Sequence, residues 1–204
     1  MKKAHSLLLS LFLSLGLITA ANTQAAVITF DDLPATDVDA IPENYNGFIW
    51  GDSFFTNVSY INKNTIPDSG YANGVVSGDY AAFNIFSTTS VINTSGGEQF
   101  DFNGAYLTAG FYDGLNIEVT GLLNSLVLFT QTITVNTQQA QWFDFNFLGI
   151  NSLSLRAWGS PSGNDFFVLD NFTYNETSVP ESSSLALLLL GLTCLLLSRK
   201  TQKA

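Results

Sequence analysis

Residues 115–120 read Leu-Asn-Ile-Glu-Val-Thr and residues 142–147 read Trp-Phe-Asp-Phe-Asn-Phe, so apolar and polar side chains alternate in both stretches. A period of two is typical of a β-strand with one buried and one exposed face. Turn-forming pairs such as Asn46-Gly47 recur at short intervals between segments of this kind. We therefore predict roughly ten short strands that fold as a single all-β antiparallel β-sandwich.

The strongest local prediction is a β-hairpin. Asp113-Gly114 lies between the segments 105–112 and 115–121, and this dipeptide favours the tight turn that joins two neighbouring antiparallel strands.

The stretch 26–180 is strongly acidic. It holds two basic residues, Lys63 and Arg156, against sixteen Asp and Glu, so its net charge is −14. Such a surface repels phosphate backbones, and we expect no nucleic-acid binding. The only histidine, His5, and the only cysteine, Cys194, lie outside this stretch, which excludes imidazole and thiol catalysis, zinc sites and disulfides from it.

The N-terminus has the three parts of a secretory signal peptide. Basic residues follow Met1, residues 7–18 are almost entirely apolar, and Thr23-Gln24-Ala25 offers small residues at the cleavage site. We predict a signal peptide over residues 1–25, recognised by the Sec translocon and cut by signal peptidase after Ala25. The alternative is an uncleaved N-terminal anchor.

The C-terminus, residues 178–204, also has three parts: a short motif, an apolar run from Leu185 to Leu197, and a basic cluster. The motif is Val179, Pro180 and Glu181, and the basic residues are Arg199, Lys200 and Lys203. Together they resemble the PEP-CTERM sorting signal, with Ser182 in place of the usual second proline. The resemblance implies a C-terminal transmembrane helix, a precursor tethered to the inner membrane, and processing by an exosortase that delivers the protein to the cell envelope or outside. The alternative is an unprocessed anchor, and in either case the basic flank is expected on the cytoplasmic side.

The domain between these signals, residues 26–177, carries a second resemblance. Its motifs are 27–34 (Val-Ile-Thr-Phe-Asp-Asp-Leu-Pro), 45–50 (Tyr-Asn-Gly-Phe-Ile-Trp), 69–78 (Ser-Gly-Tyr-Ala-Asn-Gly-Val-Val-Ser-Gly) and 166–172 (Phe-Phe-Val-Leu-Asp-Asn-Phe). They resemble exported β-sandwich domains similar to galactose-binding-like jelly rolls. The resemblance implies a single jelly-roll-like antiparallel β-sandwich and an extracellular setting, and it supplies no established activity.

Catalytic motifs are weak in this domain. Gly51-Asp52-Ser53 resembles the nucleophile block of GDSL-type esterases, but no histidine follows it to accept the serine proton. Glu118 and Asp144 are carboxylates that could face each other and hydrolyse a glycoside, although exposed acids are usually just solvated. We expect no enzymatic activity.

A glycan-binding surface is better supported by the residue types. Trp142, Asp144 and Asn146 share the strand face opposite three phenylalanines, and an aromatic ring among polar groups suits a sugar. The alternative is that both faces are covered and Trp142 belongs to the core. Further aromatic candidates near turns, for which a structural role is favoured, are Tyr45, Trp50, Tyr71, Tyr112 and Trp158.

Three acids form a hypothetical structural calcium site. Asp32 follows Ile28 and Phe30 in a period-two pattern, and Asp170 interrupts an apolar row near the end of the domain. The jelly-roll resemblance implies that the terminal strands lie side by side, so that Asp32 and Asp170 converge and Asp31 completes an oxygen cage for Ca²⁺. The alternative is that these acids cap turns or accept backbone N–H bonds.

The leading functional hypothesis is therefore a non-enzymatic envelope or extracellular-matrix protein associated with exopolysaccharide. The alternative is a lectin-like module with a defined glycan ligand, and the third is a carboxylate-based glycosidase.

Overall fold

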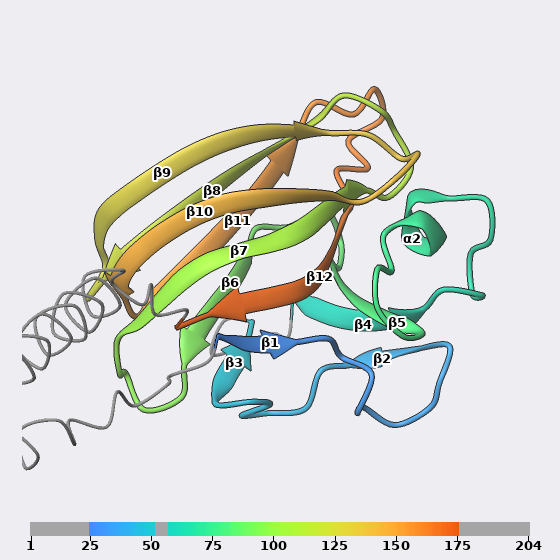
Figure 1. Cartoon of the computed structure of the whole chain (residues 1–204). Coiled ribbons are helices and arrows are strands. Elements are labelled where there is room, and N and C mark those ends of the chain that lie inside the picture. Colours follow the sequence, from blue (N-terminus) through green and yellow to red (C-terminus); the bar gives the residue numbers. More distant parts are fainter. Residues whose placement is uncertain (1–24, 52–56, 176–204) are drawn as a thin grey trace, which may run out of the picture. The chain divides into compact units, whose positions relative to one another are not determined.

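Two antiparallel sheets face each other in residues 25–51 and 57–175, the part of the chain that the computed structural model describes (Figure 1). The first sheet has the order β10 (Gln141–Ile150), β7 (Phe100–Ala109), β12 (Phe167–Tyr174), β5 (Tyr80–Asn84), β4 (Val58–Asn62) and β2 (Val38–Ala40), with β1 (Ala26–Ile28) paired to β12. The second has the order β3 (Phe48–Trp50), β6 (Ser90–Thr94), β11 (Ser152–Trp158), β8 (Leu115–Leu123) and β9 (Leu126–Val135). The predicted all-β, two-sheet architecture is confirmed.

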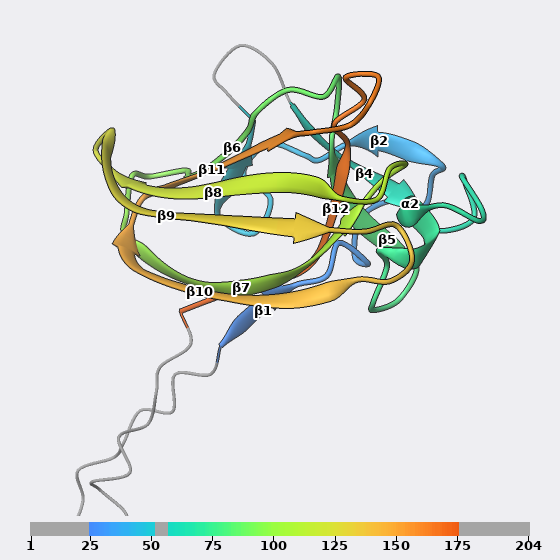
Figure 2. The same ribbon diagram turned by 90° about the horizontal axis from the view of Figure 1, so that it is seen from above.

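The hydrophobic core lies between the two sheets. Figure 2 shows β8, β9 and β11 along one side and β7 and β10 along the other. Leu115, Ile117 and Val119 of β8 are buried there, while the residues between them face outward, as their alternation predicts. Phe102 of β7 stacks on Phe172 of β12, with ring centroids 4.8 Å apart. The core is thus built from aromatic and branched side chains that alternate with polar ones along each strand.

The predicted hairpin at Asp113-Gly114 is wrong. The strand before this turn, β7, belongs to the first sheet, and the strand after it, β8, belongs to the second. The chain therefore crosses from one sheet to the other, and both strands bury their apolar face in the core between the two sheets. Asp113 stabilises the crossing by accepting hydrogen bonds from the N–H and the hydroxyl of Thr137, both at 2.7 Å.

The tight hairpin lies one strand later, between β8 and β9. Its two turn residues are Asn124 and Ser125, with φ of 51° and 68°, and Leu123 pairs with Leu126 across the turn. Positive φ at both central residues is the signature of a type I′ turn.

A cover segment, residues 63–79, packs on the outer face of the first sheet and includes the short helix α2 (Gly70–Asn73). Tyr71 of α2 joins Ile61, Ala81, Phe83 and Val168 in a second hydrophobic cluster on that face. Gly70 makes this approach feasible, since a Cβ there would lie 1.6 Å from the carbonyl oxygen of Ala109. One half of the outer face, which includes part of β7, is therefore buried beneath the segment. In the other half, called the open half, Trp142, Asp144 and Asn146 of β10 are exposed and Tyr106 of β7 is half-buried.

The predicted signal peptide up to residue 24, the sorting motif and the C-terminal transmembrane helix lie outside the described residues, as does Ser53 of the esterase-like motif. Within the described ranges, no helix is long and apolar enough to cross a membrane. The described residues belong to one compact unit.

Candidate functional site

Trp142 lies at the surface, on the open half of the first sheet's outer face. It is 37% exposed, while Phe145 and Phe147 of the same strand point into the core. The alternative in which Trp142 is a core residue is therefore wrong, and the wet face that a glycan site requires is present.

The indole of Trp142 is held in one orientation. Its Nε1 donates a hydrogen bond to Oδ1 of Asp144 at 2.7 Å, and its ring packs edge-on against Tyr106 with centroids 5.3 Å apart. The ring also lies over Gly104 of β7, where a Cβ would come within 2.4 Å of indole Cζ2. The absence of a side chain at Gly104 lets the ring rest on the sheet, so its opposite side forms a fixed apolar platform.

Asn146 lies on the same strand at a β-bulge. The register with β7 shifts between Asp144 and Phe147, and Asn146 takes a φ of 50°. Its side chain is exposed, so the bulge places an amide group beyond Asp144 on the exposed side of the strand. The structure thus brings Trp142, Asp144 and Asn146 to one open strand edge, as the alternation predicts.

Tyr106 and Gly104 are site residues that the sequence analysis missed. Tyr106 pairs with Trp142 across the two strands and lies between it and Asp170 of β12. The signal was present in the sequence, because Ala105 and Leu107 are apolar neighbours that turn inward and leave Tyr106 facing outward.

The cover segment borders this platform. Asn73 at the end of α2 donates a hydrogen bond to the carbonyl of Thr137 at 2.9 Å and accepts one from the N–H of Ala140 at 3.3 Å. Thr137 and Ala140 belong to the loop that leads into β10, and Ala140 lies two residues before Trp142. The platform therefore has the sheet as its floor and a hydrogen-bonded loop and helix at one margin.

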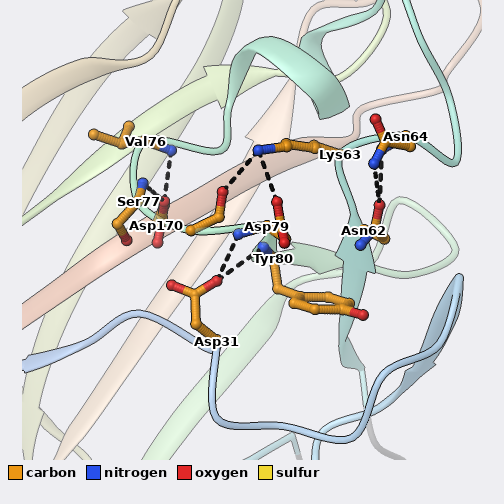
Figure 3. Close-up of polar contacts among 10 residues, drawn as sticks. Asp31, Asn62, Lys63, Asn64, Val76, Ser77, Asp79, Tyr80 and Asp170 are labelled. Carbon is orange, nitrogen blue, oxygen red and sulfur yellow. Dashed lines mark hydrogen bonds and ion pairs between the residues drawn. The ribbon is translucent and has the colours of Figure 1, made fainter.

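Two carboxylates hold the end of the cover segment in place (Figure 3). Oδ2 of Asp170 accepts hydrogen bonds from the N–H groups of Val76 (2.6 Å) and Ser77 (3.0 Å). Oδ1 of Asp31 accepts from the N–H groups of Asp79 (2.7 Å) and Tyr80 (3.1 Å). These bonds clamp the segment to β12 on one side and to the residues that follow β1 on the other.

Asp170 is fully buried, and this burial raises the pKa of its carboxyl to about 6. The backbone hydrogen bonds from Ser77, Val76 and Asn171 act in the opposite direction, while the charge of Asp31 raises the pKa further. An ion pair lies nearby on the surface, where Nζ of Lys63 is 2.7 Å from Oδ1 of Asp79.

The three acids of the hypothetical calcium site do not converge in the predicted way. β1 pairs with β12 as expected, but β1 ends at Ile28, so Asp32 does not share a strand face with it. Asp32 instead accepts a hydrogen bond from the hydroxyl of Tyr45. A bulge at Asn171, with a φ of 50°, also breaks the apolar row in which Asp170 was expected.

Asp31 and Asp170 instead accept hydrogen bonds from backbone N–H groups, which is the alternative to a calcium site given in the sequence analysis. Among residues 25–51 and 57–175, no group of three or more His, Cys, Asp or Glu could hold a metal ion. The donor set therefore does not fit a three-carboxylate cage, and calcium dependence of the fold stays a prediction.

The other aromatic candidates fall into two groups. Trp50 and Tyr71 are buried, at 3% exposure each, and so have structural roles. Trp158 lies on the outer face of the second sheet, where the guanidinium of Arg156 stands 5.5 Å from its ring centroid. Tyr112 is half-buried, and its hydroxyl accepts a hydrogen bond from Ser162.

The carboxylate pair of the glycosidase alternative is separated by the sandwich. Glu118 lies on β8 between inward-facing Ile117 and Val119, so it faces outward from the second sheet. Asp144 faces outward from the first sheet. The two acids therefore cannot flank one glycosidic bond.

No family model matches this chain, and no curated protein matches it. Among solved structures the chain is similar to TmCBM61 in complex with β-1,4-galactotriose, with 10% identity, 67% of this chain and 95% of that chain covered, and a TM-score of 0.42. It is also similar to CBM51 from Clostridium perfringens GH95 in complex with methyl-galactose, with 13% identity, 74% of this chain and 100% of that chain covered, and a TM-score of 0.36. A third similar structure is the K1 cleaved adhesin domain of Lys-gingipain from Porphyromonas gingivalis W83. It has 10% identity and a TM-score of 0.40, and 76% of this chain and 99% of that chain are covered. Because the sequence identities and TM-scores are this low, no ligand and no site residue of these structures is carried over to this chain.

Proposed function

We propose that this protein is a non-enzymatic carbohydrate-binding protein whose binding surface is the open outer face of β10 and β7. The observation that carries the proposal is the exposed indole of Trp142, which Asp144 and Tyr106 hold against the sheet. A sugar ring presents an apolar C–H face that packs on such an aromatic platform. Because the indole is already fixed, little side-chain entropy is lost when a ligand binds.

Polar groups beside the platform supply the other half of the recognition. The carboxylate of Asp144 and the amide of Asn146 are exposed next to the ring, and both can bond to hydroxyl groups. The acidic surface, with a net charge of −14 over residues 26–180 from two basic and sixteen acidic residues, repels anionic ligands. We therefore expect neutral or amino sugars to bind in preference to uronic acids and sulfated glycans.

The test is a glycan array followed by titration calorimetry with the best glycan. Trp142→Ala should weaken binding roughly tenfold or more, since a stacked ring is worth on the order of 1–3 kcal/mol at the centre of a small site. Asp144→Ala should weaken binding less, because it frees the indole without removing it.

The matched control is Trp158→Ala, which removes a surface tryptophan from the other sheet. Equal binding by the wild type and the Trp142→Ala variant contradicts the proposed site. Loss of binding in the Trp158→Ala variant alone moves the site to the second sheet.

Export and sorting are proposed from the sequence of the two ends. The signal peptide and the PEP-CTERM-like tail support an exported protein that an exosortase processes near Glu181. The intact mass of the protein extracted from its own host tests this, and a mass that retains residues 185–204 contradicts processing.

Calcium dependence has a separate test. Thermal unfolding of the purified protein in calcium and in chelator should differ by several degrees if an ion at about a hundred times its dissociation constant stabilises the fold. Superimposable unfolding curves in the two buffers contradict a calcium dependence of the fold.

A further inference from the structure

The tip of the β8–β9 hairpin exposes a group of aliphatic side chains. This apolar tip comprises the exposed Leu126, Val127 and Leu128 and the half-buried Leu122 and Leu123, and Leu148 of β10 is a further exposed aliphatic side chain. Leu126 is 66% exposed, Val127 54% and Leu148 57%. Neighbouring residues of a strand point to opposite faces, so exposure of both Leu126 and Val127 means that both faces of the hairpin are uncovered.

The apolar tip also lies in the longest uncharged stretch of an acidic domain. No Asp, Glu, Lys or Arg occurs between Glu118 and Asp144, although the surrounding domain is strongly acidic. Contiguous exposed apolar surface on a soluble domain marks a site that contacts a protein partner or a membrane.

Hydrogen bonds place the apolar tip at the end of the sandwich where the described chain finishes (Figure 1). The N–H of Asn175 donates to the carbonyl of Asp101, and Oδ1 of Asp101 accepts from the N–H of Gly149. Next along the chain, Asn151 donates from its N–H to the carbonyl of Leu122 at 2.9 Å. The hairpin therefore emerges beside the point from which the C-terminal tail continues.

The tail is short enough to keep this end of the domain near a bilayer. Nine residues lie between Asn175 and Leu185, the start of the apolar run, and the ten Cα–Cα steps that join them reach at most about 35 Å when extended. We propose that the apolar tip inserts shallowly into the lipid bilayer in which residues 185–197 anchor the chain. The proposal rests on that anchor prediction and is independent of glycan binding.

A lipid surface fits the apolar tip better than a second protein does. A partner docking on one face of the hairpin would leave the other face in water, whereas lipid surrounds both. Polar groups at the turn are already hydrogen-bonded. Nδ2 of Asn151 donates to Oδ1 of Asn124, and the backbone N–H of Asn124 donates to Oδ1 of Asn151, both at 3.0 Å. Such a turn can enter the polar interface without leaving these groups unpaired.

The experiment uses the full chain in phosphatidylcholine vesicles. Cys194→Ser removes the single cysteine, and Ser125→Cys introduces one at the turn for an environment-sensitive fluorophore. Ser162→Cys, in the exposed loop between β11 and β12 at the opposite end, is the matched control. Emission from the label at position 125 should shift to the blue and be quenched by spin-labelled lipids, while the label at position 162 does neither.

Exchange of Leu126 and Leu128 for Asn should abolish the shift at position 125 while the chain still floats with the vesicles. Equal emission at positions 125 and 162, or failure of the chain to float, overturns the proposal. A blue shift that occurs without vesicles and grows with protein concentration also overturns it, in favour of self-association.

Discussion

The two halves of the first sheet's outer face carry similar side chains in different surroundings. The covered half lies beneath residues 63–79, and the open half is the outer face of β10 with Tyr106 of β7 beside it. A carboxylate that accepts hydrogen bonds can be compared between the two halves, Asp170 in the covered half and Asp144 in the open half. Asp170 is buried and binds three backbone N–H groups, whereas Asp144 is exposed and binds the indole of Trp142. Position under the cover segment, rather than residue type, separates a structural acid from one that a ligand can reach.

Glycines permit the close contact in each half. Gly70 lets α2 approach the backbone of β7, and Gly104 lets the ring of Trp142 lie on the sheet. In both places a Cβ would occupy space that another group fills. The same device therefore closes one half of the face and builds an aromatic platform on the other.

The largest effect is expected from Gly70→Ala, because the new methyl group would overlap the carbonyl of Ala109 and push the cover segment off the sheet. The free energy of unfolding should fall by about 3 kcal/mol or more. Denaturant unfolding measures it. Gly163→Ala is the control, since nothing lies within 4 Å of its Cβ position and only its φ of 71° opposes a side chain. Equal losses of unfolding free energy in Gly70→Ala and Gly163→Ala would mean that the cover segment is not tightly packed.

The next comparison removes one aromatic ring from each half. Phe83→Ala opens a cavity beneath the cover segment and should cost about 3 kcal/mol of stability. Trp142→Ala removes a ring that is already partly in water and should cost about 1 kcal/mol or less. Thermal or denaturant unfolding of both variants checks the difference, and a cost for Trp142→Ala as large as that for Phe83→Ala contradicts the open-face description.

Asp170 should make stability depend on pH between about 4 and 7. Burial raises its pKa from an ordinary value of 3.8 to about 6, so in this window the folded state binds a proton that the unfolded state has released. The contribution of Asp170 to stability therefore increases as the pH falls and is lost as the pH rises through 6. Relative to Asp170→Asn, the wild type should gain about 1 kcal/mol between pH 7.5 and pH 5. Parallel stability profiles of the two proteins contradict the buried, proton-binding Asp170.

The smallest effect is expected from Lys63→Met. The ion pair with Asp79 is exposed to solvent, with 43% and 62% of the two side chains accessible, so its loss should cost less than about 1 kcal/mol. The cost should shrink further in high salt. A loss of several kcal/mol that salt does not reduce would show that Lys63 holds the cover segment through its other bond, to the carbonyl of Gly78.

Alternation along the strands predicts the parts of the molecule that local sequence determines. It places Leu115, Ile117 and Val119 in the core, and it places Trp142 and Asp144 on one exposed strand face. It does not reveal which strands are neighbours. Asp113-Gly114 has the composition of a hairpin turn, yet the chain crosses between sheets there because burial of two apolar faces outweighs the local turn preference.

Bulges and the cover segment limit the prediction of the site. Asn171 shifts the register of β12, so Asp170 lies on the outer face and Phe172 in the core, although a strict period of two puts them on one face. Nothing local to Asp170 announces that Val76 and Ser77, more than ninety residues earlier, will donate to it. Long-range partners of this kind are set by topology, which periodicity does not contain.

The last strand of the described residues, β12, occupies the middle of the first sheet, where β7, β5 and β1 all pair with it. A nascent chain that lacks residues 167–174 cannot bring these three strands together, and it also lacks the acid that fastens Val76 and Ser77. We expect the sheet to close only after residue 174 has been synthesised, because β12 pairs with β1, near the start of the described residues, as well as with β5 and β7. Late closure of this kind is compatible with the proposed export, in which the chain would cross a membrane before it folds.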